Sequence, residues 1–108
     1  MARYGAECRK RMFVQEPHQQ LMNAVMGLAG ETGEIADYWK KMLFHPPHPK
    51  HDELDLKAEI GDLLWYLATL NEIVYGDSLL DRARENIQKL QKRWPERYEG
   101  VNVEELVL

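Results

Sequence analysis

The sequence has one cysteine, no long apolar run and no excess of positive charge. Cys8 has no partner for an intramolecular disulfide, and a chain of this size without disulfides is typical of a reducing compartment. A membrane span needs about 20 consecutive apolar residues, and the most apolar stretch, residues 63–70, is far shorter. Fourteen Lys and Arg against eighteen Asp and Glu give a net charge of −4, which disfavours a nucleic acid backbone as partner. We therefore expect a cytoplasmic protein that binds neither nucleic acid nor membrane.

The chain contains long proline-free intervals in which apolar residues recur with the periodicity of a helix. Its 108 residues fit a single domain of ordinary folded composition. Apolar residues recur at spacings of three and four, and no run of β-branched residues is typical of a strand. Three such stripes bury themselves against one another, which predicts an all-α fold, an antiparallel helical bundle of the four-helix type. The stripes are Leu21, Val25, Leu28, Ile35, Trp39 and Met42; Leu56, Ile60, Leu63, Leu67, Leu70 and Val74; and Leu80, Ala83, Ile87, Leu90 and Trp94.

Local signals predict where these helices begin and end. Pro17 suits the first turn of the first helix, because its missing N–H costs nothing there. Asp52 is a candidate cap for the second helix, and Gly76 is placed to end it. Ser78, with Asp81 three residues on, matches a capping box and begins the third helix, which stops before the last proline.

The two ends of the chain give weaker patterns. Residues 3–14 predict a short fourth helix with inward-facing Tyr4, Cys8, Met12 and Phe13, and residues 103–108 predict a docked turn of helix. So few helices cannot enclose all the large side chains, including Trp39 and Trp65. We therefore expect a homodimer or a homotetramer.

Two acidic motifs of identical spacing lie in the first two predicted helices. Acids three residues apart are neighbours on a helix, and each leading glutamate borders its apolar stripe, so antiparallel packing brings four carboxylates together. One such pair alone is common on a solvated helix face, but the repetition favours a shared site. Four like charges repel unless divalent cations lie among them, and carboxylate oxygens favour Mg²⁺, with Mn²⁺ as an alternative. The motifs are Glu31, Gly33, Glu34 and Tyr38, and Glu59, Gly61, Asp62 and Tyr66.

Other residues bear on this site. Gly33 and Gly61, and less distinctly Gly27 and Gly30, cost helix stability and so suggest close approach of a ligand or a neighbouring backbone. On the third predicted helix, Asn86 borders the apolar stripe in the same way as Glu31 and Glu59 border theirs. Lys89 and Arg93 follow it and suit either phosphate contact or a solvated helix end. The histidines at positions 45, 48 and 51 are separated by prolines and cannot share a helix face, which argues against zinc.

Three segments, GLAGETGEIADYWKK, EIGDLLWYLA and ENIQKLQKRWP, resemble the MazG-like nucleotide pyrophosphohydrolases of the all-α NTP pyrophosphatase superfamily. The resemblance covers residues 18–97 of a single domain spanning 1–108, with residues 98–108 as a tail. It implies an oligomeric bundle that uses Mg²⁺ to hydrolyse a nucleoside triphosphate to the monophosphate and pyrophosphate.

Residue by residue, the resemblance implies metal binding, catalytic and substrate-binding roles. Glu31 or Glu34 would orient the attacking water as the catalytic base. Many family members have a further acid where this chain has Gly30, which leaves the number of metal ions open. The implied metal ligands are Glu31, Glu34, Glu59 and Asp62, and the implied substrate contacts are Asn86, Lys89, Arg93, Tyr66 and Trp39.

Two alternatives remain open from the sequence. The chain could act on phosphoribosyl-ATP, because that enzyme has a similar bundle and similar acids. It could also be a non-catalytic helical module that binds a nucleotide or dimerises and keeps the acids as metal ligands only.

Overall fold

The computed structural model describes residues 2–45 and 53–108. These residues form a 3₁₀ turn and four helices without a strand, which confirms the predicted all-α class. Asp52, His48 and His51 lie outside the described residues. The elements are α1 (Tyr4–Lys10), α2 (Pro17–Phe44), α3 (Glu53–Tyr75), α4 (Leu79–Arg93) and η1 (Val103–Glu105).

The start of α2 follows the local signals. Pro17 is its first residue, as predicted. The carboxylate of Glu16 accepts hydrogen bonds from the backbone N–H groups of His18 and Gln19, at 3.1 and 2.9 Å. These bonds satisfy two of the donors that a helix leaves unpaired at its beginning.

The link between α3 and α4 also matches its prediction. Gly76, which follows the last residue of α3, has a φ of +69°, a left-handed conformation that favours glycine. The capping box is present, because the backbone N–H of Ser78 donates to Asp81 at 3.0 Å and the Ser78 hydroxyl accepts from Leu80 at 3.1 Å. The sequence therefore predicted this boundary from its local chemistry.

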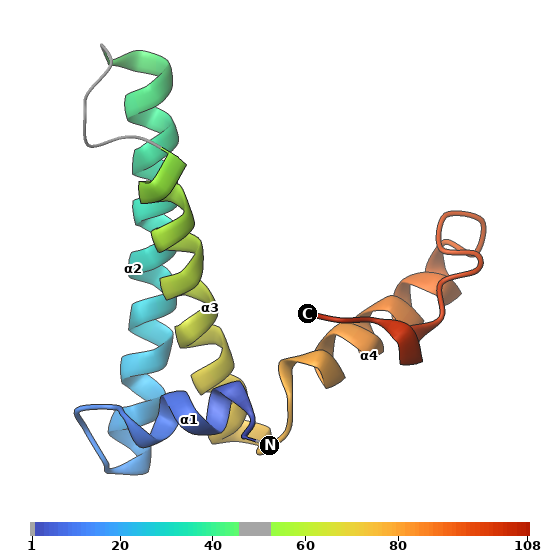
Figure 1. Cartoon of the computed structure of the whole chain (residues 1–108), viewed down its shortest axis with the longest axis horizontal. Helices are drawn as coiled ribbons and strands as arrows, with labels where there is room; N and C mark the ends of the chain where they lie inside the picture. Colours follow the sequence, from blue (N-terminus) through green and yellow to red (C-terminus); the bar gives the residue numbers. More distant parts are fainter. Residues whose placement is uncertain (1, 46–52) are drawn as a thin grey trace.

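Helices α2 and α3 form a long antiparallel hairpin, and α1 packs across α3 at one end of it (Figure 1). A Cβ on Gly5 would lie 2.7 Å from the carbonyl oxygen of Ala68, so α1 approaches α3 very closely. Arg3 and Glu72 join the two helices in an ion pair of 2.6 Å. The buried side chains gather at this end, namely Cys8, Met12, Gln20, Ala24, Ala68, Thr69 and Asn71.

One expectation for the N-terminal segment is wrong. Helix α1 ends at Lys10, so the predicted inward row breaks before it is complete. Met12 is buried, but Phe13 in the following turn is fully exposed. Phe13 comes five residues after Cys8, about 140° round a helix, and lies beyond the end of α1, so it does not share the face that carries Cys8.

Helix α4 projects away from the hairpin and packs mainly on the C-terminal tail (Figure 1). The Arg84 guanidinium donates to the carbonyls of Val103 and Glu104 at 3.0 and 3.4 Å. The Gln91 amide donates to Tyr98 and Val101 at 3.3 and 2.9 Å. The tail thus forms the predicted turn of helix, and α4 as a whole packs mainly on this tail rather than on α2 and α3.

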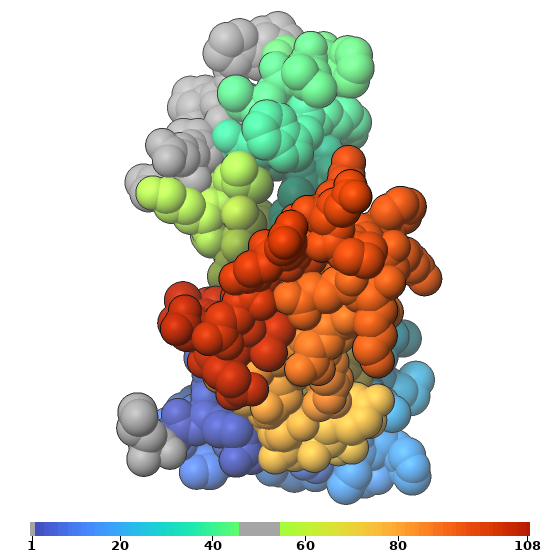
Figure 2. Space-filling view, turned by 90° about the vertical axis from the view of Figure 1, so that its right-hand side faces the viewer, coloured from blue at the N-terminus to red at the C-terminus, as the bar shows by residue number. Residues whose placement is uncertain are grey.

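The end of the hairpin where α2 stops and α3 begins extends beyond α4 and the tail (Figure 2). Large apolar side chains of α2, including Trp39, Leu43 and Phe44, are exposed there. Among the described helices, none has the length and apolar character that crossing a membrane requires.

Candidate metal centre

The contact between Tyr66 on α3 and Gly27 on α2 sets the register of the hairpin. The Tyr66 ring lies so close to α2 that a Cβ at Gly27 would be 2.2 Å from a ring carbon. Glu31 lies about one turn beyond Gly27, and Asp62 lies about one turn before Tyr66. Because the helices run in opposite directions, this contact brings the two acids to the same level.

Three carboxylates meet at that level. Oxygen atoms of Glu31, Glu59 and Asp62 all lie within 4.8 Å of one another. The two glutamates are half-buried, and Asp62 is exposed. Oε2 of Glu31 is buried and has no hydrogen-bond partner within residues 2–45 and 53–108. A buried carboxylate oxygen without a partner is costly, and a cation among these acids would satisfy it.

The neighbouring carboxylates raise the proton affinity of Glu31. The pKa of Glu31 rises from its ordinary value of 4.5 to about 7. The largest cause is a hydrogen bond that the protonated Glu31 donates to Glu59, followed by burial and by the charges of Glu59, Asp62 and Glu34. Glu31 is therefore partly protonated near neutral pH without a cation, and cation binding would displace that proton.

Glu34, the remaining predicted metal ligand and candidate base, stands outside this three-acid cluster. It is exposed, and its charge reaches Glu31 without its oxygens joining the group. Among the described residues, its carboxylate has no ion-pair or hydrogen-bond partner. The structure thus brings together three of the four predicted acids and leaves Glu34 at their edge.

The cluster opens onto a hollow of about 310 Å³ lined by Glu31, Asp62, Trp65 and Tyr66. Tyr66, a predicted substrate contact, lies at this hollow. Trp65 packs edge to face on Tyr66, with ring centres 5.2 Å apart and planes at 82°. Sequence reasoning treated Trp65 as a core or interface residue and so missed it. Its position three residues after Asp62 was the available signal.

Trp39, the other predicted aromatic contact, is not at the hollow. Its ring packs edge to face on Tyr38 at 5.2 Å, and its side chain is 49% exposed. It lies two turns of α2 beyond Glu31, toward the end of the hairpin where α2 stops and α3 begins.

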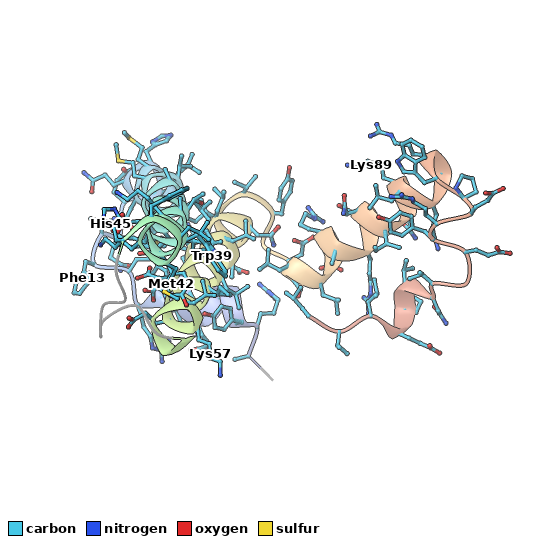
Figure 3. All side chains as sticks on the ribbon, turned by 90° about the horizontal axis from the view of Figure 1, so that it is seen from above. Phe13, Trp39, Met42, His45, Lys57 and Lys89 are labelled. Carbon is cyan, nitrogen blue, oxygen red and sulfur yellow. The ribbon has the colours of Figure 1, made fainter. Side chains whose placement is uncertain are left out.

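The predicted phosphate contacts Asn86, Lys89 and Arg93 all lie on α4. Lys89 and Arg93 line a separate depression of about 530 Å³ with other α4 residues. Figure 3 shows Lys89 on the projecting helix, apart from Trp39 on the hairpin. Because α4 projects away, one chain does not bring these residues to its own acids.

The glycines of the two motifs are not tightly packed in this chain. A Cβ at Gly33 or Gly61 would meet nothing within 4 Å. The expected close approach of a neighbouring backbone is therefore not found at these positions. At Gly27, in contrast, the ring of Tyr66 leaves no room for a side chain, so glycine is needed there.

Comparison with known proteins decides the family. The model of the MazG nucleotide pyrophosphohydrolase domain matches residues 18–98, which include all of α3 and α4 and nearly all of α2. The chain belongs to the MazG family. Enzymes of the MazG family are generally metal-dependent, which is consistent with the acidic cluster.

A similar protein is the Gene 37 protein of Mycobacterium phage L5, which is 40% identical over 77 residues. The match covers 68% of this chain and 65% of the phage protein. No solved structure matches the chain.

Proposed function

We propose that this MazG-family chain is a Mg²⁺-dependent pyrophosphohydrolase that converts an NTP or dNTP to its monophosphate and pyrophosphate. The observation that carries the proposal is the cluster of Glu31, Glu59 and Asp62, which includes a buried carboxylate oxygen without a partner. Family membership over residues 18–98 supports the class of reaction.

The donor set fits a hard divalent cation. Glu31, Glu59 and Asp62 offer carboxylate oxygens alone, which suits Mg²⁺, with Mn²⁺ as the alternative. When bound there, the cation neutralises charge on the triphosphate and makes a water molecule easier to deprotonate. The three acids would hold and orient it.

Glu34 is our choice for the catalytic base. Glu31 is engaged with Glu59, whereas the exposed Glu34 has no described partner and stands beside the cluster. A carboxylate in that position accepts a proton from a water molecule aimed at the α-phosphorus. Glu31 then serves as a ligand rather than as the base.

Tyr66 and Trp65 are the proposed nucleotide contacts, because they line the same hollow as Glu31 and Asp62. Trp39 stays a prediction from the sequence. Asn86, Lys89 and Arg93 fit phosphate contact only where α4 of another copy approaches the acids. The homodimer or homotetramer expected from the sequence therefore belongs to this proposal.

Pyrophosphate release from a panel of NTPs and dNTPs with Mg²⁺ tests the proposal. We expect Asp62→Asn to abolish turnover with helicity unchanged. The matched control is Asp37→Asn, an acid on α2 that pairs with Lys40 and Lys41 outside the cluster. Turnover in Asp62→Asn would contradict the proposal.

The same assay with phosphoribosyl-ATP added to the panel, together with a measurement of nucleotide binding, separates the alternatives. Turnover of phosphoribosyl-ATP alone would indicate the related enzyme. Mg²⁺-dependent nucleotide binding without pyrophosphate release would indicate the non-catalytic module.

A further inference from the structure

An apolar hollow lies where the beginning, the middle and the end of the chain come together. It has a volume of about 370 Å³, and its walls come from α1, α3, the start of α4 and the last residue of the tail. Glu31, Glu59 and Asp62 are not among the described residues that line it, so it is separate from the acidic cluster. The side chains of its apolar lining are Tyr4, Leu64, Ala68, Leu79, Leu80 and Leu108.

The charged side chains at this hollow already have partners. Arg3 pairs with Glu72 at 2.6 Å, and Asp77 pairs with Arg82 at 2.8 Å. The hydroxyl of Ser78 accepts the hydrogen bond that caps α4. Because a polar occupant would have to compete with these bonds, the hollow suits an apolar side chain.

The C-terminal tail runs antiparallel to α4 and so leads back to this hollow. The Gln91 amide, near the end of α4, donates to the carbonyl of Val101 at 2.9 Å. The Arg84 guanidinium, about two turns closer to the start of α4, donates to the carbonyl of Val103 at 3.0 Å. Figure 1 shows the end of the tail between α4 and the hairpin. The tail is therefore fixed along α4 and directed toward the start of that helix, where the hollow lies.

Leu108 borders the hollow without filling it. It is 73% exposed, although it lines the hollow together with residues of α1 and α3. Val107 is 89% exposed and is not among the lining residues. Removing an exposed leucine side chain from water is favourable. A cavity of about 150 Å³ is enough to hold benzene, so a hollow of about 370 Å³ has room for this side chain.

We propose that the tail is a strap, which closes when Leu108 enters the hollow of its own chain. Residues 76–78 join α4 to the hairpin at one point, and α4 packs mainly on the tail. With Leu108 seated against Tyr4 and Leu64, the tail joins α4 to the hairpin at a second point. Two points of attachment resist rotation of α4 about the link, so the strap holds the direction of α4. This inference does not depend on hydrolysis or on the metal site, because it rests on packing within one chain.

Nuclear Overhauser effects in the full chain with labelled leucine methyl groups test the docking. We expect contacts from the methyl groups of Leu108 to the Tyr4 ring and to the methyl groups of Leu64. Absence of these contacts would overturn the proposal. A mixture of labelled and unlabelled chains identifies their source. Contacts that arise only between labelled and unlabelled chains would mean that the tail fills the hollow of another copy, which also contradicts a strap within one chain.

Hydrogen exchange measures whether the docked tail stabilises the walls of the hollow. Leu108→Asp places a charge at the hollow, and we expect the amides of α1 to exchange about tenfold faster than in wild type. Val107→Asp adds the same charge one residue earlier, at a residue that does not line the hollow, and we expect wild-type exchange. Both substitutions lie beyond η1, so neither changes a residue of a helix. An unchanged rate in Leu108→Asp, or an equal increase in Val107→Asp, would refute the strap.

Discussion

The Tyr66 ring on α3 occupies the space that a side chain on Gly27 of α2 would need, because a Cβ there would lie 2.2 Å from the nearest ring carbon. This one contact aligns Glu31 with Asp62 across the hairpin. The site therefore depends on a glycine that lies outside the acidic motifs themselves.

Gly27→Ala and Gly33→Ala should change stability in opposite directions. At Gly27 the new methyl group collides with Tyr66, and overpacking of this kind costs about 1–3 kcal/mol. At Gly33 the methyl group enters open space, so the better helix propensity of alanine stabilises the fold by about 0.5–1 kcal/mol. Urea unfolding of the two metal-free variants measures both changes in the free energy of unfolding. Changes of the same sign would argue against the packing of Tyr66 on Gly27 described above.

The metal-free protein should lose stability as pH rises from about 5 to 8. The pKa of Glu31 in the fold, about 7, lies above its ordinary value of 4.5. Protonated Glu31 therefore stabilises the fold fully below the lower value, and this contribution is lost as pH passes through the higher one. The groups that face it are Glu34 on its own helix and Glu59 and Asp62 on α3.

Thermal melting in a chelator across this pH range measures the effect. Glu31→Gln cannot ionise and should flatten the dependence. A melting temperature that rises with pH in the wild type, or an equally steep fall in Glu31→Gln, would contradict the assignment.

Mg²⁺ should raise the melting temperature more at about pH 8 than at about pH 5.5. At the lower pH the proton on Glu31 competes with the cation, because carboxylate ligands must be deprotonated to bind it. Calorimetric titration in two buffers of different ionisation enthalpy measures the proton released. No stabilisation at either pH would argue against a metal site, and removal of the ion by a chelator should reverse any gain.

Glu34→Gln and Asp62→Asn should both lose turnover, but for different reasons. Glu34→Gln removes the proposed base but leaves the three clustered ligands, so stabilisation by Mg²⁺ stays while kcat falls by about 10²–10⁴-fold. Asp62→Asn removes a ligand, so it should lose both turnover and stabilisation by Mg²⁺. Steady-state kinetics and thermal melting on the same preparations separate the two. Loss of Mg²⁺ stabilisation in Glu34→Gln would make that residue a ligand instead.

The helix boundaries were predictable because their causes are local. Pro17, Gly76 and the Ser78–Asp81 capping box each act within a few residues of the chain. The meeting of Glu31 with Glu59 and Asp62 was also predictable, since helical spacing places these acids beside the apolar stripes of two antiparallel helices.

The position of α4 could not be predicted in the same way. In the link that precedes α4, Asp77 accepts hydrogen bonds from Asn71 and Arg82, and the spacing of apolar residues carries no information about such polar contacts. The predicted meeting of Lys89 and Arg93 with the acids failed within one chain for this reason. The close fit of Tyr66 on Gly27 likewise arises from a contact between distant residues.

The most direct measurement of the central claim is anomalous diffraction from crystals of this protein grown with Mn²⁺. The account predicts a peak within coordination distance of carboxylate oxygens from Glu31, Glu59 and Asp62, and no such peak in Asp62→Asn. A protein that releases pyrophosphate while its Mn²⁺ lies elsewhere, or while these three side chains hold no ion, would contradict it.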